Sequence, residues 1–284
     1  MTGEVSGARG MMLAYGAVSL AAVTVGAWIC AAHGVAAGSW GRNLAAWLVG
    51  AVIAASLAAT VRPGAASVAL WVAPIGLLVT LFSPDQQGVH RWIDAGPLHV
   101  NMAMLLLPAA AVGLAVQAGR WWAWAAAFVS LGVLVAQPDA SQATTLAIVM
   151  ALVALGQMRR RGLQALVLAG AAGLAAAAWM RPDPLQPVAE VEEILGLAWR
   201  MSPLLAGLAG LLLVAVAAAP VLFSRTGSPT IRAAGLAVGA CLLAWAAAPF
   251  LGAFPVPFVG VGMSAIVGGW LGAGLLPGLM RAQV

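Results

Sequence analysis

Long apolar stretches separated by short polar segments run through the whole chain. Ten stretches come close to the ~20 apolar residues that a helix needs to cross a bilayer. The fifth and sixth are short and rich in Ala, so one re-entrant hairpin is an alternative for that pair. The predicted membrane-spanning helices lie at roughly 10–32, 43–61, 65–82, 99–118, 121–137, 141–157, 162–180, 202–224, 233–252 and 258–280.

The connections between these stretches are short, with none much longer than about twenty residues. A separate soluble domain does not fit, so we expect a single transmembrane domain over residues 1–284. The first apolar stretch has no convincing signal-peptide cleavage pattern and is long enough to span, so we keep it as the first helix. The pattern predicts an all-α polytopic membrane protein.

Composition supports the same class. The chain is 63% hydrophobic and 7% charged, whereas soluble domains carry about 25% charged residues. Polar side chains are therefore scarce, and we look for function in the few polar loops.

The arginines predict the orientation, because the chain contains no lysine. With ten spans and a cytoplasmic N-terminus, nine of the 13 arginines lie inside, as the positive-inside rule requires. Both termini are then cytoplasmic. The arginines are spread over the loops and do not form a continuous basic stripe, so we expect no nucleic-acid partner. We expect them to contact membrane lipids. The four predicted outside are Arg42, Arg91, Arg181 and Arg200.

Seven of the eight acidic residues and all three histidines fall on the outer side of this topology. Ordinary solvation of loops would explain this clustering. A polar site that opens to the outer face would explain it equally, because ionisable groups at membrane depth are costly and usually functional. Both explanations stay open at this point.

Several kinds of chemistry have no signature in the sequence. Cys30 and Cys241 lie inside predicted spans and give no disulfide framework. No Cys or His pair has metal-ligand spacing, and nucleotide-binding, zinc-protease and Gly-x-Ser-x-Gly patterns are missing. The sequence therefore indicates no cofactor with certainty and leaves only a divalent cation open.

The most informative polar loop is Gly88-Val-His-Arg-Trp-Ile-Asp-Ala-Gly96, which lies between two predicted spans. An arginine fork suits phosphate oxygens geometrically, which makes Arg91 a candidate anion ligand. The alternative is that Arg91 is a snorkelling side chain that pairs with Asp85 or Asp94.

Four segments, in order along the chain, resemble the SEDS family (shape, elongation, division and sporulation), which includes FtsW and RodA. Gly88–Gly96 resembles the family's G-x-x-R-W-I-x-x-G stretch, and Gln137-Pro-Asp139 is similar to the start of its E/Q-P-D-L-G-T-A hairpin. Pro187-Val-Ala-Glu-Val-Glu-Glu-Ile194 matches the position of L-P-E-x-H-T-D-F-I-F-A. Pro257-Phe-Val-Gly-Val-Gly-Met-Ser264 is similar to the P-F-x-S-x-G-G-S loop before the tenth span.

This resemblance implies a peptidoglycan glycosyltransferase of the bacterial inner membrane, in cell-wall synthesis linked to division or cell shape. It implies an isoprenyl-pyrophosphate-linked saccharide as substrate and a class B penicillin-binding protein as partner. Placing Pro187 on the family's proline puts Glu192 on its catalytic aspartate, with Glu193 as the competitor after a one-residue slip. Arg91 would bind pyrophosphate and Trp92 would pack against sugar or lipid. The implied substrate-binding set is His90, Arg91, Trp92, Asp139 and Ser264.

The chain departs from the family pattern at several polar positions. Glutamate replaces the aspartate, the outer loop before it is short, and the Q-P-S-E-x-x-K signature is missing, with Asn101 at its start and Leu107 at its lysine. Three classes therefore stay open: an active enzyme, a non-catalytic relative that binds a lipid carrier or partner, and a transporter. The transporter would place its site at helices broken by proline, and the candidates are Pro108, Pro203, Pro220 and Pro249.

Two further expectations concern local physics. Glu190, Glu192 and Glu193 crowd one loop, so mutual repulsion should raise the pKa of at least one of them. Alternatively, they form a solvated acidic segment at the positive end of a helix dipole. Small-residue spacing in the last span predicts close helix packing, at Gly268, Gly272, Gly274 and Gly278.

Overall fold

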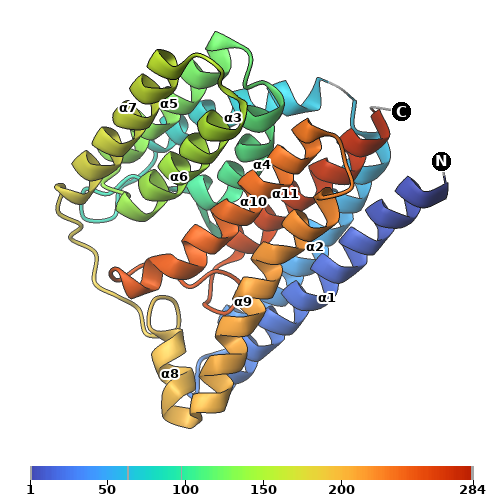
Figure 1. Cartoon of the computed structure of the whole chain (residues 1–284). Coiled ribbons are helices and arrows are strands. Elements are labelled where there is room, and N and C mark those ends of the chain that lie inside the picture. The colour runs from blue at the N-terminus through green and yellow to red at the C-terminus, as the bar shows by residue number, and fades with distance from the viewer. Residues whose placement is uncertain (1, 63, 97, 283–284) are drawn as a thin grey trace.

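The structure, a computed structural model, describes residues 2–62, 64–96 and 98–282. Long helices pack side by side into one bundle (Figure 1). Each predicted span corresponds to one helix. These are α1 (Thr2–Ala32), α2 (Ala37–Thr60), α3 (Ala65–Thr80), α4 (Met102–Val116), α5 (Trp121–Ala136), α6 (Ala140–Gln157), α7 (Arg161–Trp179), α9 (Pro203–Ser224), α10 (Pro229–Ala247) and α11 (Met263–Ala282).

Among the described residues, seven helices are long and apolar enough to cross a membrane, and α3, α4 and α5 are shorter apolar helices. The chain is thus a helical, multi-pass membrane protein. The pair suspected of forming a re-entrant hairpin consists of two separate helices, of 16 and 18 residues. Their lengths, about 24 and 27 Å at 1.5 Å per residue, come near the ~30 Å of a bilayer core. The number of full spans and the side on which the termini lie remain predictions.

Four short elements were not predicted. Strands β1 (Trp92–Ala95) and β2 (Leu98–Asn101) form an antiparallel hairpin within the polar island and the segment after it. The fourth span was expected to begin at residue 99, but helix α4 begins at Met102 because the Asn101 side chain caps it by accepting a hydrogen bond from Met104 N–H. Helix α8 (Ile194–Met201) and the 3₁₀ turn η1 (Ala248–Phe250) complete the described elements.

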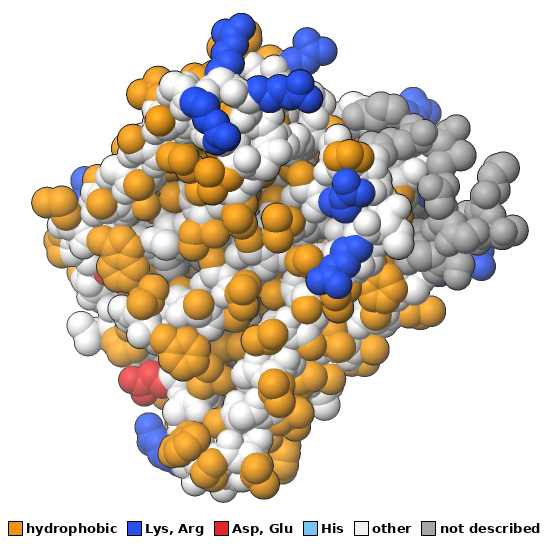
Figure 2. Space-filling view, viewed as in Figure 1, with side chains coloured by type: hydrophobic (Ala, Val, Ile, Leu, Met, Phe, Trp, Pro, Cys, Tyr) orange, Lys and Arg blue, Asp and Glu red, His pale blue; other side chains and the backbone are white. Residues whose placement is uncertain are grey.

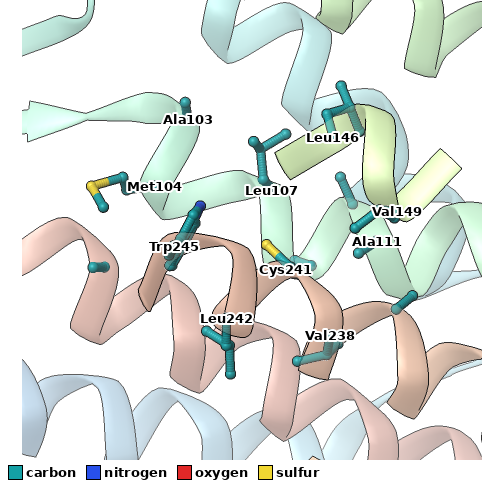
Figure 3. Close-up of a cluster of buried hydrophobic side chains, with 14 of the residues drawn as sticks. Ala103, Met104, Leu107, Ala111, Leu146, Val149, Val238, Cys241, Leu242 and Trp245 are labelled. Atoms are coloured by element: carbon teal, nitrogen blue, oxygen red, sulfur yellow. The ribbon is translucent and has the colours of Figure 1, made fainter. Parts of the chain in front are cut away.

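Helix α4 lies in the middle of the bundle because it is apolar on every side. It packs against α3, α6, α10 and α11. Figure 3 shows buried side chains of α4, α6 and α10 in contact, among them Leu107, Leu146, Cys241 and Trp245. The indole N–H of Trp245 donates to the Gln142 side chain at 2.7 Å, which satisfies the ring's polar atom inside this core. Cys30 and Cys241 are free and buried, as predicted.

The glycines of α11 allow it to approach two other helices closely. A Cβ on Gly268 would lie 2.0 Å from the carbonyl oxygen of Met104, and one on Gly272 would meet Pro108 at 2.7 Å, both in α4. On the opposite side, Gly274 and Gly278 face α2 with equally little room. The predicted role of these glycines in packing is confirmed.

The prolines do not break the helices in the way that a transporter site would require. Pro108 lies inside α4 and Pro220 lies inside α9, and both helices continue through them. Pro203 is the first residue of α9, and Pro249 lies in η1. Pro108 and Pro220, two of the candidates for helix breaks, therefore break neither helix, because a bundle tolerates such prolines where neighbouring groups satisfy the backbone.

The charges are distributed unequally over the surface. In the view of Figure 2, most of the arginine side chains lie in the upper and right-hand parts, and the acidic side chain prominent on this face lies at the lower left, beside a further arginine. This asymmetry is what the predicted topology requires, although it does not assign either end to the cytoplasm.

Candidate functional site

The four segments that resemble one family lie far apart in the sequence but meet at one end of the bundle. There, the start of α2, the β-hairpin, the connection between α7 and α8, and the loop before α11 enclose a cavity of about 430 Å³. Its polar lining includes Ser39, Arg42, Gln86, His99, Asn101 and Glu192.

Two of these loops are fastened to each other through their backbones. Val256 N–H donates to the Val191 carbonyl at 3.1 Å, and Val261 N–H donates to the Glu190 carbonyl at 2.8 Å. A Cβ on Gly260 would lie 2.5 Å from the Val191 carbonyl oxygen, so only glycine allows this approach.

The buried Asn43 side chain holds the loop before α11 from the other side. Its Nδ2 donates to the Gly260 carbonyl at 2.8 Å, and its Oδ1 accepts from Gly262 N–H at 3.0 Å. Glu190 and Val191 are therefore held by a loop that is itself anchored to α2. The part of the wall formed by residues 190–191 and 256–262 is thus held in place.

Glu192 lies where three cavities meet. It lines the cavity of about 430 Å³ just described, which is called the large cavity below, and an adjoining small one of about 50 Å³. It also lines a third cavity beside α8, which at about 510 Å³ exceeds both in volume. Its carboxylate accepts a hydrogen bond from Val188 N–H at 2.8 Å. Burial raises the pKa of Glu192 above its ordinary value, the hydrogen bonds from backbone N–H groups lower it, and the charges of Asp183 and Glu190 raise it further.

A raised pKa in this loop was predicted, and Glu192 is the residue that carries it. The expected cause was repulsion among the three glutamates. Burial is instead the largest cause, and repulsion from Asp183 and Glu190 is secondary. A carboxyl group of this kind titrates nearer neutrality than a solvated one, as a general base requires.

Glu193 has a different environment. It is exposed, it lines the third cavity together with Arg200, and it occupies the N-cap position of α8 without a side-chain capping bond. Burial thus distinguishes Glu192, which the alignment singles out, from Glu193, its competitor after a one-residue slip. Glu192 is the one that faces the large cavity.

Arg91 is buried and surrounded by acceptors. Its guanidinium lies 2.6 Å from an Asp183 carboxylate oxygen and 3.6 Å from an Asp139 carboxylate oxygen. It also donates to the backbone carbonyls of Gln137 and Pro138. The alternative pairing with Asp85 or Asp94 is wrong, because Asp85 accepts from Gly88 N–H and Asp94 pairs with His99 at 2.6 Å.

The remaining predicted residues differ in how closely they approach the cavities. Trp92 lines both the large cavity and the small one, and Asp139 lines the small one while capping α6. Ser264 lines the large cavity and accepts a hydrogen bond from Asn101 N–H at 2.9 Å. His90 lines none of the cavities described here; its ring lies 3.1 Å from the Ser83 carbonyl oxygen.

Four polar residues at this site were not singled out from the sequence. Arg42 and His99 line the large cavity, Asn43 anchors its wall, and Asp183 pairs with Arg91. Asn43 carried a usable signal, since an amide at the start of an apolar helix needs a partner. Arg42 and Asp183 were counted only as topology and loop charge.

Within the described part of the chain, no group of three His, Cys, Asp or Glu side chains is arranged to hold a metal ion. We assign no step to a metal.

Comparison with known proteins identifies the fold. No protein-family model and no curated protein sequence matches this chain. Among solved structures, it is similar to the rod shape determining protein RodA of Thermus thermophilus, at 21% identity over 93% of this chain and 94% of that one, with a TM-score of 0.66. An aspartate-to-alanine mutant of the same RodA gives 20% identity, 93% and 95% coverage, and 0.64.

A chain from a peptidoglycan synthase complex, described as coordinating polymerization and crosslinking, is 19% identical, with 96% of this chain and 97% of that chain covered and a TM-score of 0.60. The protein therefore has the RodA fold over nearly its whole length. The fold that the four segments predicted is confirmed.

Proposed function

We propose that this protein is a SEDS-like glycosyltransferase that acts on an isoprenyl-pyrophosphate-linked saccharide in bacterial cell-wall synthesis. The observation that carries the proposal is the position of Glu192. It is the partly buried carboxylate at the junction of the cavities, and its pKa is raised toward the range of a general base.

The proposed chemistry needs a base, an anomeric carbon and a leaving group. Glu192 takes the proton from the acceptor sugar hydroxyl while that oxygen attacks the anomeric carbon of the donor. The bond from this carbon to the pyrophosphate oxygen breaks, and the lipid pyrophosphate leaves with the electron pair. Base catalysis of this kind contributes about 10²–10⁴ in rate.

Negative charge accumulates on the leaving pyrophosphate and requires a cation nearby. Arg42 and Glu192 line the same large cavity, whereas Arg91 lines the smaller adjoining one. We assign the first contact with pyrophosphate to Arg42, and we retain Arg91 as a second ligand. Trp92 lines both cavities and offers a flat surface for a sugar ring.

The fold supports a role at the bacterial cytoplasmic membrane, because RodA is named as a rod shape determining protein and the third similar chain comes from a peptidoglycan synthase complex. By the same likeness we propose a class B penicillin-binding protein as the partner. The description of that complex names both polymerization and crosslinking, and a penicillin-binding protein would be the partner that supplies crosslinking.

A second candidate is a non-catalytic relative that binds a lipid carrier or a partner without turnover. One observation favours it. Arg91 is already paired with Asp139 and Asp183, so the chain itself supplies the counter-charge for this proposed phosphate ligand.

Turnover separates the two candidates. The purified protein, alone and with a class B penicillin-binding protein, is incubated with fluorescent lipid-linked disaccharide, and the products are resolved by gel. We expect polymer. Binding of the labelled lipid without polymer in either condition would reject the enzyme and support the second candidate; neither binding nor polymer would reject both.

A further inference from the structure

Arg91 connects three parts of the molecule. The residue directly precedes β1, its guanidinium donates to carbonyls in the connection between α5 and α6, and it pairs with Asp183 in the connection between α7 and α8. The arginine side chain is 9% exposed and the Asp139 side chain 4%. The Asp183 side chain is 29% exposed, so it is the partner that solvent reaches.

The two carboxylates differ in how firmly they are held. Asp139 accepts additional hydrogen bonds from Ser141 and from Gln142 N–H, which fix it at the start of α6. Asp183 lies in a segment without regular structure. Among the described residues, it accepts only a local hydrogen bond from Leu185 N–H in addition to its contact with Arg91. Asp183 is therefore the carboxylate that can leave.

Departure of Asp183 would move a wall of the site. Leu185, Gln186 and Val188 line the large cavity, and all three lie within five residues after Asp183. Figure 1 shows this connection as an extended yellow chain that runs from α7 to α8 along the outside of the bundle. Arg91 thus ties the segment that begins at Asp183 to the connection between α5 and α6.

The space beside Arg91 is too small for a phosphate ligand while Asp183 is there. The cavity that Arg91 lines holds about 50 Å³, room for a few water molecules at most. It shares Trp92, Asn101 and Glu192 with the large cavity. If the segment after Asp183 moved outward, the two spaces would join and a ligand in the large cavity could reach the guanidinium.

We propose that the Asp183 carboxylate occupies the phosphate position on Arg91, and that a phosphate-bearing ligand displaces it and so releases the wall formed by residues 183–188. This inference rests on the proposed function, because it names Arg91 as a ligand of the same site. Asp183 accepts one charge-assisted hydrogen bond from a terminal nitrogen of the Arg91 guanidinium, at 2.6 Å. A phosphate oxygen can accept the same bond, which is why a phosphate can replace the carboxylate.

The test uses the full-length protein in detergent micelles, with a Leu185→Cys substitution as reporter, because the Leu185 side chain is half-buried and lines both cavities. Cys30 and Cys241 are buried, so the unsubstituted protein gives the background rate of maleimide labelling. Inorganic pyrophosphate is the first probe, and an isoprenyl pyrophosphate added to the micelles is the second, which distinguishes a free anion from a lipid headgroup. Pyrophosphate affinity is measured separately by calorimetry.

We expect Asp183→Asn to speed labelling of the reporter severalfold without ligand. The same substitution should lower the dissociation constant for pyrophosphate about tenfold, because the ligand no longer has to replace one charge-assisted hydrogen bond. In the Asp183-containing reporter, pyrophosphate itself should speed labelling, and Arg91→Gln should abolish that response. Asp85→Asn, an outer-loop acid that does not contact Arg91, is the matched control and should change neither quantity.

Equal labelling of the Asp183→Asn reporter and its parent would overturn the proposal. So would faster labelling with unchanged pyrophosphate affinity, because Asp183 would then be a tether that does not compete with ligand. Neither readout depends on turnover. A protein that makes no polymer but passes this test would contradict only the proposed function. A protein that makes polymer but fails this test would contradict only the displacement of Asp183.

Discussion

At the scale of single residues, the carboxyl group of Glu192 links stability to pH. Its folded-state pKa lies above the ordinary value of 4.5, because burial disfavours the charged form. The folded protein therefore holds this proton more tightly than the unfolded chain does. The resulting stabilisation is complete below the unfolded pKa and is lost as pH rises through the folded pKa.

We therefore expect Glu192→Gln to remove this pH dependence. The midpoint temperature of thermal unfolding is measured in detergent for the variant and the parent. Relative to the parent, the variant should be more stable at pH 8 than at pH 4, because only the parent loses stability as Glu192 ionises. Glu193→Gln, at an exposed position, is the control and should shift both midpoints little. A Glu192→Gln difference that does not change between the two pH values would show that the carboxyl group is solvated.

The sequence predicted several residues of the site, but it did not predict which of them contact each other. A polar island between apolar stretches pointed to Arg91 and Trp92, and alignment of short segments pointed to Glu192. The partner of Arg91 could not be found in the same way, because Asp183 lies 92 residues away and the contact depends on how helices between them pack. Arg42 was not singled out, because nothing in its local sequence distinguishes it from the other arginines predicted to lie outside.

At the scale of elements, apolar stretches of helical length predicted all ten long helices of the described chain, because burial in lipid forces backbone groups to bond within each segment. The β-hairpin and α8 could not be predicted in this way. Each strand has four residues and α8 has eight, and such short elements depend on neighbouring segments more than on their own pattern.

The close packing of α11 on α4 leads to a prediction about Gly268. A methyl group there would lie 2.0 Å from the Met104 carbonyl oxygen, so Gly268→Ala should destabilise the protein by about 1–3 kcal/mol through overpacking. Gly207→Ala in α9 is the control, because nothing lies within 4 Å of its Cβ position. It should be neutral or slightly stabilising, since alanine favours helix. Thermal unfolding in detergent compares them, and equal midpoints would contradict the packing described here.

At the scale of the whole molecule, the orientation in the membrane is a prediction from the arginine distribution. Gln87 and Gln186 are exposed in the loops predicted to lie outside, and Arg159 is exposed in a loop predicted to lie inside. Cysteines at the first two positions should react with a membrane-impermeant maleimide on intact spheroplasts. A cysteine at position 159 should react only after permeabilisation, and the opposite pattern would invert the topology.

The central claim is that four distant segments form one catalytic site around Glu192. Polymer formation from fluorescent lipid-linked disaccharide, measured for the parent, Glu192→Gln and Glu193→Gln with equal amounts of folded protein, tests it most directly. Removing the base should reduce the rate by about 10²–10⁴ in Glu192→Gln, while Glu193→Gln keeps activity near the parent's and both variants still bind the lipid. Polymer formed by Glu192→Gln at the parent's rate would contradict the assignment.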